Sequence, residues 1–93
     1  MISIDLKTPT EITTGIAKRF SLIRKRRKIT QKDLAKKSGV SYASLRRFEE
    51  TGEISLISLS KLSIALDISE ELDGLFSDVP FNSIEEVING QSK

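Results

Sequence analysis

Charged side chains are distributed unevenly along this sequence. Twelve lysines and arginines lie in residues 18–47 against the single acid Asp33, so this segment has a net charge of +11. In residues 48–93, ten acids oppose only two lysines, and the net charge there is −8. Dense positive charge attracts polyanions such as nucleic acids, whereas the acidic remainder repels them. The run at residues 24–28 could by itself be a solvated helix face, but the whole segment predicts a polyanion-binding surface.

The residue types exclude most kinds of catalytic and metal chemistry. The chain has no cysteine and no histidine, so it lacks disulfides, thiolate ligands, the commonest metal ligand and the commonest general base. Serine, lysine, aspartate and glutamate remain as candidate catalytic residues. The sequence contains no glycine-rich phosphate loop and no paired-carboxylate motif in which they could act. We therefore predict that the protein is not an enzyme and uses no metal or cofactor.

Length and hydropathy predict one small domain. The 93 residues supply a single modest core, and a composition that is 30% charged and 38% hydrophobic is typical of a folded chain. The longest apolar run is residues 64–66, and no basic segment precedes an apolar stretch at the amino terminus. These features predict a soluble, cytoplasmic protein without membrane contact.

Helices are needed to position the basic side chains, and capping residues indicate where the first one begins. Thr8 is placed as a cap, Pro9 at the first helical position, and Glu11 where it reaches back to the cap. The helix is expected to end near Lys28. One apolar stripe, with spacings of four, four and three residues, leaves the basic residues on other faces. The stripe comprises Ile12, Ile16, Phe20 and Ile23.

Two shorter helices follow, joined by a glycine turn. Thr30 and Asp33 form a second capping box, and Gly39 ends the helix that they begin. Ser41 caps the next helix, which ends at residues 51–52. The side chains expected in the core are Leu34, Ala35, Val40, Leu45 and Phe48. Those expected on outer faces are Tyr42, Ala43, Arg46 and Arg47.

The rest of the sequence predicts two more helices and two apolar ends. Ser55 caps a fourth helix and Ser69 a fifth, so five helices span a domain at residues 9–77. Their inner side chains are expected to be Leu59, Leu62, Leu66, Leu72, Leu75 and Phe76. The predicted fold class is all-α.

Short extensions flank this domain. In residues 1–8, apolar and polar residues alternate as in a strand; the apolar ones are Ile2, Ile4 and Leu6. In residues 78–93, a capping box at residues 83–86 indicates a short helix, with a strand as the alternative. The apolar residues that we single out in this end are Phe81, Ile84, Val87 and Ile88.

Residues 30–49 resemble the helix-turn-helix of the lambda-repressor and Cro-like family, also called the XRE family. The resemblance rests on a glutamine that opens the first helix, a Leu-Ala pair, Gly-Val-Ser at the turn and Leu-x-x-Phe-Glu in the second helix. These are Gln31, Leu34 and Ala35, residues 39–41, and residues 45–49. The leucine-rich helix that follows and the five-helix pattern also match the family's domain.

The resemblance implies a DNA-binding transcriptional regulator whose helix at residues 42–50 lies in the major groove of a double-stranded operator. It implies base-reading roles for Tyr42, Ala43 and Arg47. Arg47 is the strongest candidate, because a guanidinium donates two hydrogen bonds to guanine O6 and N7; the alternative is a solvated or phosphate-bound arginine. The implied phosphate contacts are Gln31, Lys32, Ser44 and Arg46.

Two features depart from the family pattern. Tyr42 replaces a common glutamine, so bidentate adenine recognition is lost, and a ring against a thymine methyl or a sugar is the hypothesis that remains. Residues 49–53, interpreted as the loop after the second helix, are more acidic than the family's phosphate-facing loops. Because phosphate repels carboxylates, this loop is not assigned to DNA.

The fold does not define the biological role. Residues 44–56, together with residues 5–9, are similar to HipB-type antitoxins, which repress their own operon and bind a HipA-like kinase toxin. The alternative is a protein-interaction module that neutralises a partner without DNA. Such a module would have no reason to keep the +11 segment.

A single helix-turn-helix domain reads only a half-site, so we expect a homodimer that pairs through the apolar ends. The alternative is that both ends fold back over the monomer. The acids after Phe48 then remain for a protein partner with a basic face.

Overall fold

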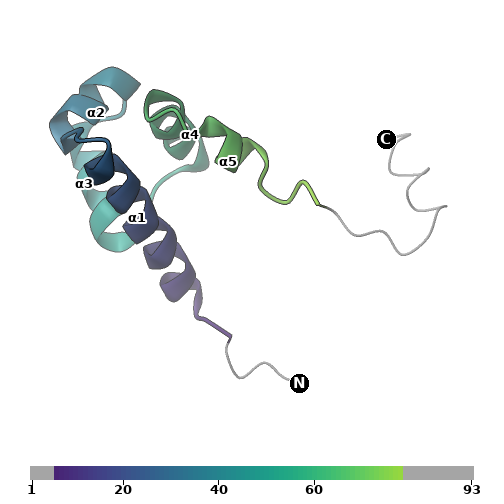
Figure 1. The fold of residues 1–93 in the computed structure, drawn as a ribbon. Helices are drawn as coiled ribbons and strands as arrows, with labels where there is room; N and C mark the ends of the chain where they lie inside the picture. Colours follow the sequence, from purple (N-terminus) through teal and green to yellow (C-terminus); the bar gives the residue numbers. More distant parts are fainter. Residues whose placement is uncertain (1–5, 79–93) are drawn as a thin grey trace.

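The computed structural model describes residues 6–78, which form five helices and no strand (Figure 1). The helices are α1 (Pro9–Arg26), α2 (Gln31–Ser38), α3 (Tyr42–Thr51), α4 (Leu56–Ala65) and α5 (Ser69–Asp73). Helix α1 packs on α3, α2 packs on both α3 and α4, and α5 packs on α4. The predicted all-α, five-helix class is confirmed.

Side-chain caps begin four of the helices at the predicted residues. The N–H of Thr8 donates to Glu11 Oε1 at 2.8 Å, and the N–H of Glu11 donates to Thr8 Oγ1 at 3.1 Å, which completes the predicted capping box. Thr30, Ser41 and Ser55 each accept the N–H three residues later, at 3.0 to 3.1 Å. Each cap stabilises its helix by about 1 kcal/mol.

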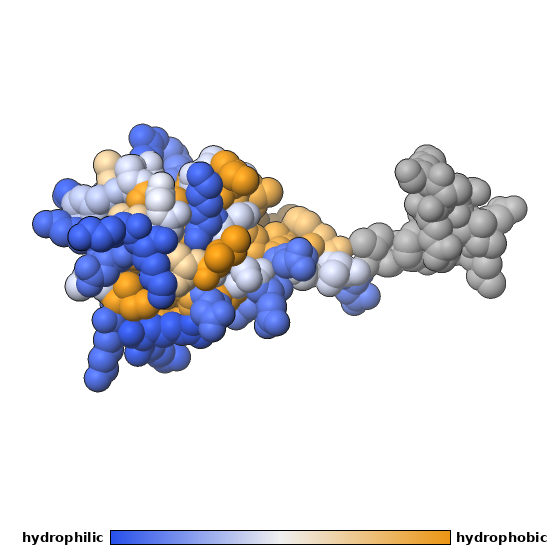
Figure 2. Space-filling model, turned by 90° about the horizontal axis from the view of Figure 1, so that it is seen from above, coloured by the Kyte–Doolittle hydropathy of each residue, from blue (hydrophilic) through white to orange (hydrophobic). Residues whose placement is uncertain are grey.

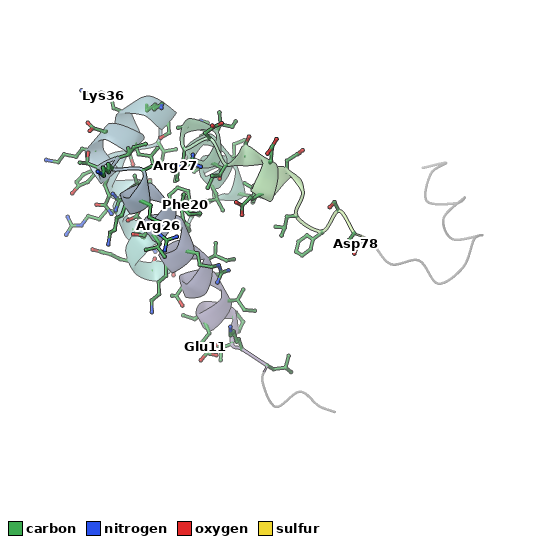
Figure 3. The ribbon with its side chains drawn as sticks, in the orientation of Figure 1. Glu11, Phe20, Arg26, Arg27, Lys36 and Asp78 are labelled. Atoms are coloured by element: carbon green, nitrogen blue, oxygen red, sulfur yellow. The ribbon has the colours of Figure 1, made fainter. Side chains whose placement is uncertain are left out.

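The hydrophobic core lies where α1 to α4 meet. The rings of Phe20 and Phe48 pack edge to face, with centroids 5.4 Å apart and an interplanar angle of 70°; such a pair adds about 0.5 to 1.5 kcal/mol beyond its area burial. Figure 3 shows Phe20 directed into the helix cluster. The other buried hydrophobic residues are Ala17, Leu34, Ala35, Val40, Leu45, Leu62 and Leu66. The core positions predicted for α2, the turn and α3 are therefore confirmed, and Leu59 on α4 packs against them half-buried.

The predicted apolar stripe on α1 is wrong in its first half. Ile12 and Ile16 are 50% and 39% exposed, although Phe20 is buried and Ile23 is partly buried. The residues that α1 buries are Ala17, Phe20 and Arg24, at spacings of three and four. Either stripe satisfies helical periodicity, and the packing of α3 along α1 decides which one faces inward.

The end of the domain also differs from the prediction. Ile68, rather than Ser69, occupies the cap position of α5, without a side-chain hydrogen bond, and α5 ends at Asp73. Leu75 and Phe76 lie beyond the helix and are exposed, Phe76 to 83%. Figure 1 shows α5 beside α4 at one end of the helix cluster, with residues 74–78 leading away from it.

Parts of both predicted extensions lie outside the described residues. These are the strand residues Ile2 and Ile4 and the capping box at residues 83–86. Leu6 belongs to the described chain, has no regular secondary structure and is exposed.

Candidate nucleic-acid interface

The first turns of α2 and α3 lie beside each other and present polar side chains to solvent. Lys32 Nζ on α2 lies 5.6 Å from the centroid of the Tyr42 ring on α3. Of the seven residues predicted to contact DNA, six are exposed and Gln31 is half-buried. The exposed six are Lys32, Tyr42, Ala43, Ser44, Arg46 and Arg47. The opposite face of α3 is buried in the core through Leu45 and Phe48, so α3 turns its polar side outward.

A buried ion pair connects the helices beneath this surface. Arg24 on α1 donates from Nε and Nη2 to the two carboxylate oxygens of Glu49 on α3, at 2.7 and 2.9 Å. Its third nitrogen, Nη1, donates to the carbonyl of Ile29 at 2.7 Å. The two charged side chains are only 8% and 6% exposed. A bidentate pair of this kind restricts both the distance and the orientation of the two helices.

Gln31, the first residue of α2, joins the same network. Its Nε2 donates to Glu49 Oε1 at 2.9 Å. Burial raises the pKa of Glu49, but hydrogen bonds from Arg24 and Gln31, together with the charge of Arg24, outweigh that effect and hold the pKa below its ordinary value of 4.5. Glu49 is therefore ionised at neutral pH, and one carboxylate links α1, α2 and α3.

Two other arginines on α3 pair with carboxylates at the surface. Arg46 Nε lies 3.4 Å from Glu50 Oε2, one turn along the same helix. Arg47 donates from Nη2 to Glu53 Oε1, on the loop that leads to α4. All four side chains are 60% to 67% exposed, so water screens both pairs.

Not every cation of the basic segment is available to a polyanion. Arg24 is buried, and Arg27 donates from Nη1 to the carbonyl of Leu66 at the end of α4. In Figure 3, Arg27 lies on the side of α1 that faces α4, whereas Lys36 lies at the outer end of α2. Apart from Arg27, the exposed cations of residues 18–47 outside α3 are Lys18, Arg19, Lys25, Arg26, Lys28, Lys32, Lys36 and Lys37.

The comparison with protein families matches residues 21–72 to the Helix-turn-helix family HTH_3. The chain belongs to this helix-turn-helix family. The match covers more than half of the sequence and confirms the resemblance to lambda-repressor and Cro-like proteins, so the protein is a DNA-binding regulator. Neither the comparison with curated proteins nor that with solved structures finds a match.

The described residues provide no candidate metal site and no candidate membrane span. Within residues 6–78, no three acids, histidines or cysteines gather where they could hold a metal ion. No helix in this range is both long and apolar enough to cross a membrane.

The buried network contradicts two predictions from the sequence. Arg24 is predicted on a solvent-facing side of α1, and Glu49 in the loop after α3; the structure buries the first and places the second inside α3. Helix α3 ends at Thr51, so its predicted end at residues 51–52 is confirmed, and Glu50 lies inside the helix. The one local signal for Arg24 is its spacing, because it follows Phe20 by four residues on the buried face of the helix.

Proposed function

We propose that the protein is a sequence-specific repressor that inserts α3 into the major groove of its operator. Residues Tyr42, Ala43 and Arg47 face base edges, and Gln31, Lys32, Ser44 and Arg46 face phosphates. The observation that supports this most is the exposed polar side of α3, on a helix whose other side is buried and whose orientation is restricted by Arg24 and Glu49. The major groove is about 12 Å wide and admits one such helix.

The start of α2 supports the phosphate assignments. The first N–H groups of a helix lack partners within it and favour an anion. Gln31 Nε2 carries two hydrogens, and its bond to Glu49 uses one, so the second is available to a phosphate oxygen. Lys32 lies over the Tyr42 ring and places a positive charge between the two helix starts.

Salt titration of DNA binding tests the central claim. Each neutralised phosphate contributes about −0.9 to the slope of log K against log salt concentration, so a dimer with several phosphate contacts should show a steep decline. A flat response, or no DNA binding at low salt, would contradict the proposal. It would favour the alternative function, a module that binds and neutralises a protein partner without DNA.

Two substitutions distinguish base contacts from phosphate contacts. Arg47→Ala should reduce the preference among operator variants, because a bidentate base contact discriminates by about 1 to 3 kcal/mol. Lys32→Ala should weaken binding to all sequences by a similar factor. Equal losses on every sequence for both variants would make Arg47 a phosphate ligand.

We infer that the protein acts as a homodimer, because one domain of this size reads a half-site. The two apolar ends of the sequence are the first candidates for its interface.

A third candidate for the dimer interface is a surface on α4 and α5. Helices α4 and α5 line an apolar hollow of about 570 Å³. Several of the large hydrophobic residues that line it are exposed to solvent. They are Leu56, Ile64, Leu75 and Phe76. Figure 2 shows hydrophobic residues continuing toward the end of the domain where α5 lies. Residues 78–93, which carry the further apolar residues Val79, Phe81, Ile84, Val87 and Ile88, follow in the sequence.

Sedimentation at micromolar concentration tests the dimer. Deletion of residues 80–93 and the substitution Ile64→Asp separate the carboxy-terminal end from the α4 surface, and loss of the dimer in a folded variant identifies the interface. A wild-type protein that is monomeric with and without DNA would contradict the two-fold arrangement.

For the biological role, we propose the autoregulating antitoxin of a HipA-like kinase toxin. The similarity of residues 44–56 to HipB-type antitoxins and the acidic character of residues 48–93 support this role. Copurification from the native host tests it, because a bound kinase and promoter DNA would be recovered together. Recovery of promoter DNA without a protein partner would instead support a stand-alone repressor.

A further inference from the structure

We propose that Glu53 is a specificity-determining residue, which positions Arg47 for base reading and keeps it from acting as a phosphate ligand. This inference rests on the proposed function, in which Arg47 faces a base. Glu53 itself touches no base in this arrangement and acts through the arginine.

The backbone that carries Glu53 is held in place from two sides. Gly52 has φ 82°, and a Cβ atom there would lie 2.7 to 2.9 Å from backbone atoms of Thr13 and Thr14, so the loop backbone lies directly against α1. Thr51 Oγ1 donates to the carbonyl of Arg47 at 2.8 Å and accepts the N–H of Glu53 at 3.2 Å. One hydroxyl therefore fixes the backbone of Glu53 relative to that of Arg47.

The side chains then meet across this fixed backbone. Arg47 donates from Nη2 to Glu53 Oε1. The pair lies on the wall of a hollow of about 390 Å³ between α3 and the start of α4, and its other polar lining residues are Ser44, Ser55 and Ser58, which carry no charge. Among the residues that line this hollow, Glu53 is thus the one anion that attracts the guanidinium.

The chemistry of the two possible DNA ligands differs. A guanidinium has five N–H donors, so Arg47 can keep its bond to Glu53 and still donate two hydrogen bonds to guanine. Guanine O6 and N7 are neutral acceptors and tolerate a nearby carboxylate. A phosphate is an anion and is repelled by Glu53, so Arg47 binds phosphate only at an electrostatic cost. The carboxylate therefore favours base contact over backbone contact.

Arg46 and Glu50 provide a matched comparison within the same helix. They also form an exposed arginine–glutamate pair, with the two residues one helical turn apart on α3. Arg46 is proposed to contact phosphate, so Glu50 should weaken binding to every sequence without changing the preference among them.

The experiment compares two duplexes, one selected by the wild-type protein from a random-sequence pool and a scrambled duplex of the same composition. For Glu53→Gln we expect tighter binding to the scrambled duplex, with a slope of log K against log salt steeper by about 0.9. Binding to the selected duplex should be unchanged or weaker. The ratio of the two dissociation constants should fall about threefold to fivefold, which corresponds to about 0.7 to 1 kcal/mol for an exposed pair.

Two further variants make the result decisive. Glu50→Gln removes the same charge and should tighten both duplexes alike, with an unchanged ratio. Glu53→Asp keeps the charge but shortens the reach, and its ratio should lie between those of wild type and Glu53→Gln. If Glu53→Gln leaves the ratio unchanged or behaves like Glu50→Gln, the inference is wrong and the proposed function still holds. If the wild-type protein selects no duplex at all, the proposed function itself fails.

Discussion

The helix-turn-helix side of this domain and its α4–α5 side are built from different interactions. On the first side, Arg24, Gln31 and Glu49 form a buried polar network between three helices, and the surface above it is polar. On the second side, helix α5 packs on α4 alone among the helices, and large apolar side chains such as Ile64 and Phe76 remain exposed.

The difference matches what the two sides are proposed to do. A buried ion pair contributes little net stability because both charges lose their hydration, but it is strongly directional. Reading bases requires α3 at one orientation, which a bidentate pair helps to enforce. An apolar surface is less directional and suits association with another protein chain.

The largest expected effect is on the polar network. Arg24→Ala should lower the free energy of unfolding by about 3 to 5 kcal/mol, because it leaves Glu49 buried without its partner. Arg46→Ala, the matched control at an exposed pair, should cost less than about 1 kcal/mol. Urea denaturation measures both. Equal, small losses would show that the buried pair does not hold the helix-turn-helix side together.

A second comparison uses two glycines with nearly the same backbone conformation. Gly39 and Gly52 have φ values of 80° and 82°, but a Cβ would meet nothing within 4 Å at Gly39 and backbone atoms of α1 at Gly52. Gly39→Ala should cost about 1 to 2 kcal/mol for the left-handed conformation alone. Gly52→Ala should cost about 1 to 3 kcal/mol more from overpacking. Thermal unfolding of both variants measures the difference, and equal costs would contradict the close approach of α1 to the loop.

Acid should affect the helix-turn-helix side through Glu49. Its pKa in the folded protein lies below 4.5, so its ionised form stabilises the fold above the unfolded-state pKa, and this stability is lost as pH falls through the folded-state pKa. The free energy of unfolding of the wild type should therefore decline more steeply below pH 4.5 than that of Glu49→Gln. Urea titrations at a series of acidic pH values measure the two slopes, and parallel declines would exclude Glu49 as the cause.

The smallest effect is expected on the α4–α5 side. Phe76→Ser should change the stability of the monomer by no more than about 0.5 kcal/mol, because the side chain is exposed. Urea unfolding at a protein concentration too low for dimer formation measures the stability of the monomer. Sedimentation at higher concentration measures whether the same variant still forms a dimer. A loss above about 1 kcal/mol in the monomer would mean that the chain ends fold back over Phe76, which is the alternative to the dimer.

The sequence by itself determined the features that depend on neighbours within about one helical turn. Thr8 and Glu11 lie three residues apart, Ser41 caps the N–H three residues later, and Gly39 supplies the backbone conformation that ends α2. These local signals predicted four helix starts, the turn and the core positions of α2 and α3. The start of α5 was not predictable in this way, because Ser69 satisfies the local pattern but Ile68 takes the cap position.

Tertiary structure alone decided which of two equally periodic faces of α1 is buried and which charges pair. Arg24 and Glu49 are 25 residues apart, and Arg27 and Leu66 are 39 apart, so no local spacing connects them. Each lysine or arginine contributes the same charge to the segment total, whether it is buried like Arg24 or exposed like Arg47. Only the packing of α3 and α4 against α1 separates the arginines that hold the helices together from those available to DNA, because burial and pairing depend on where the helices meet.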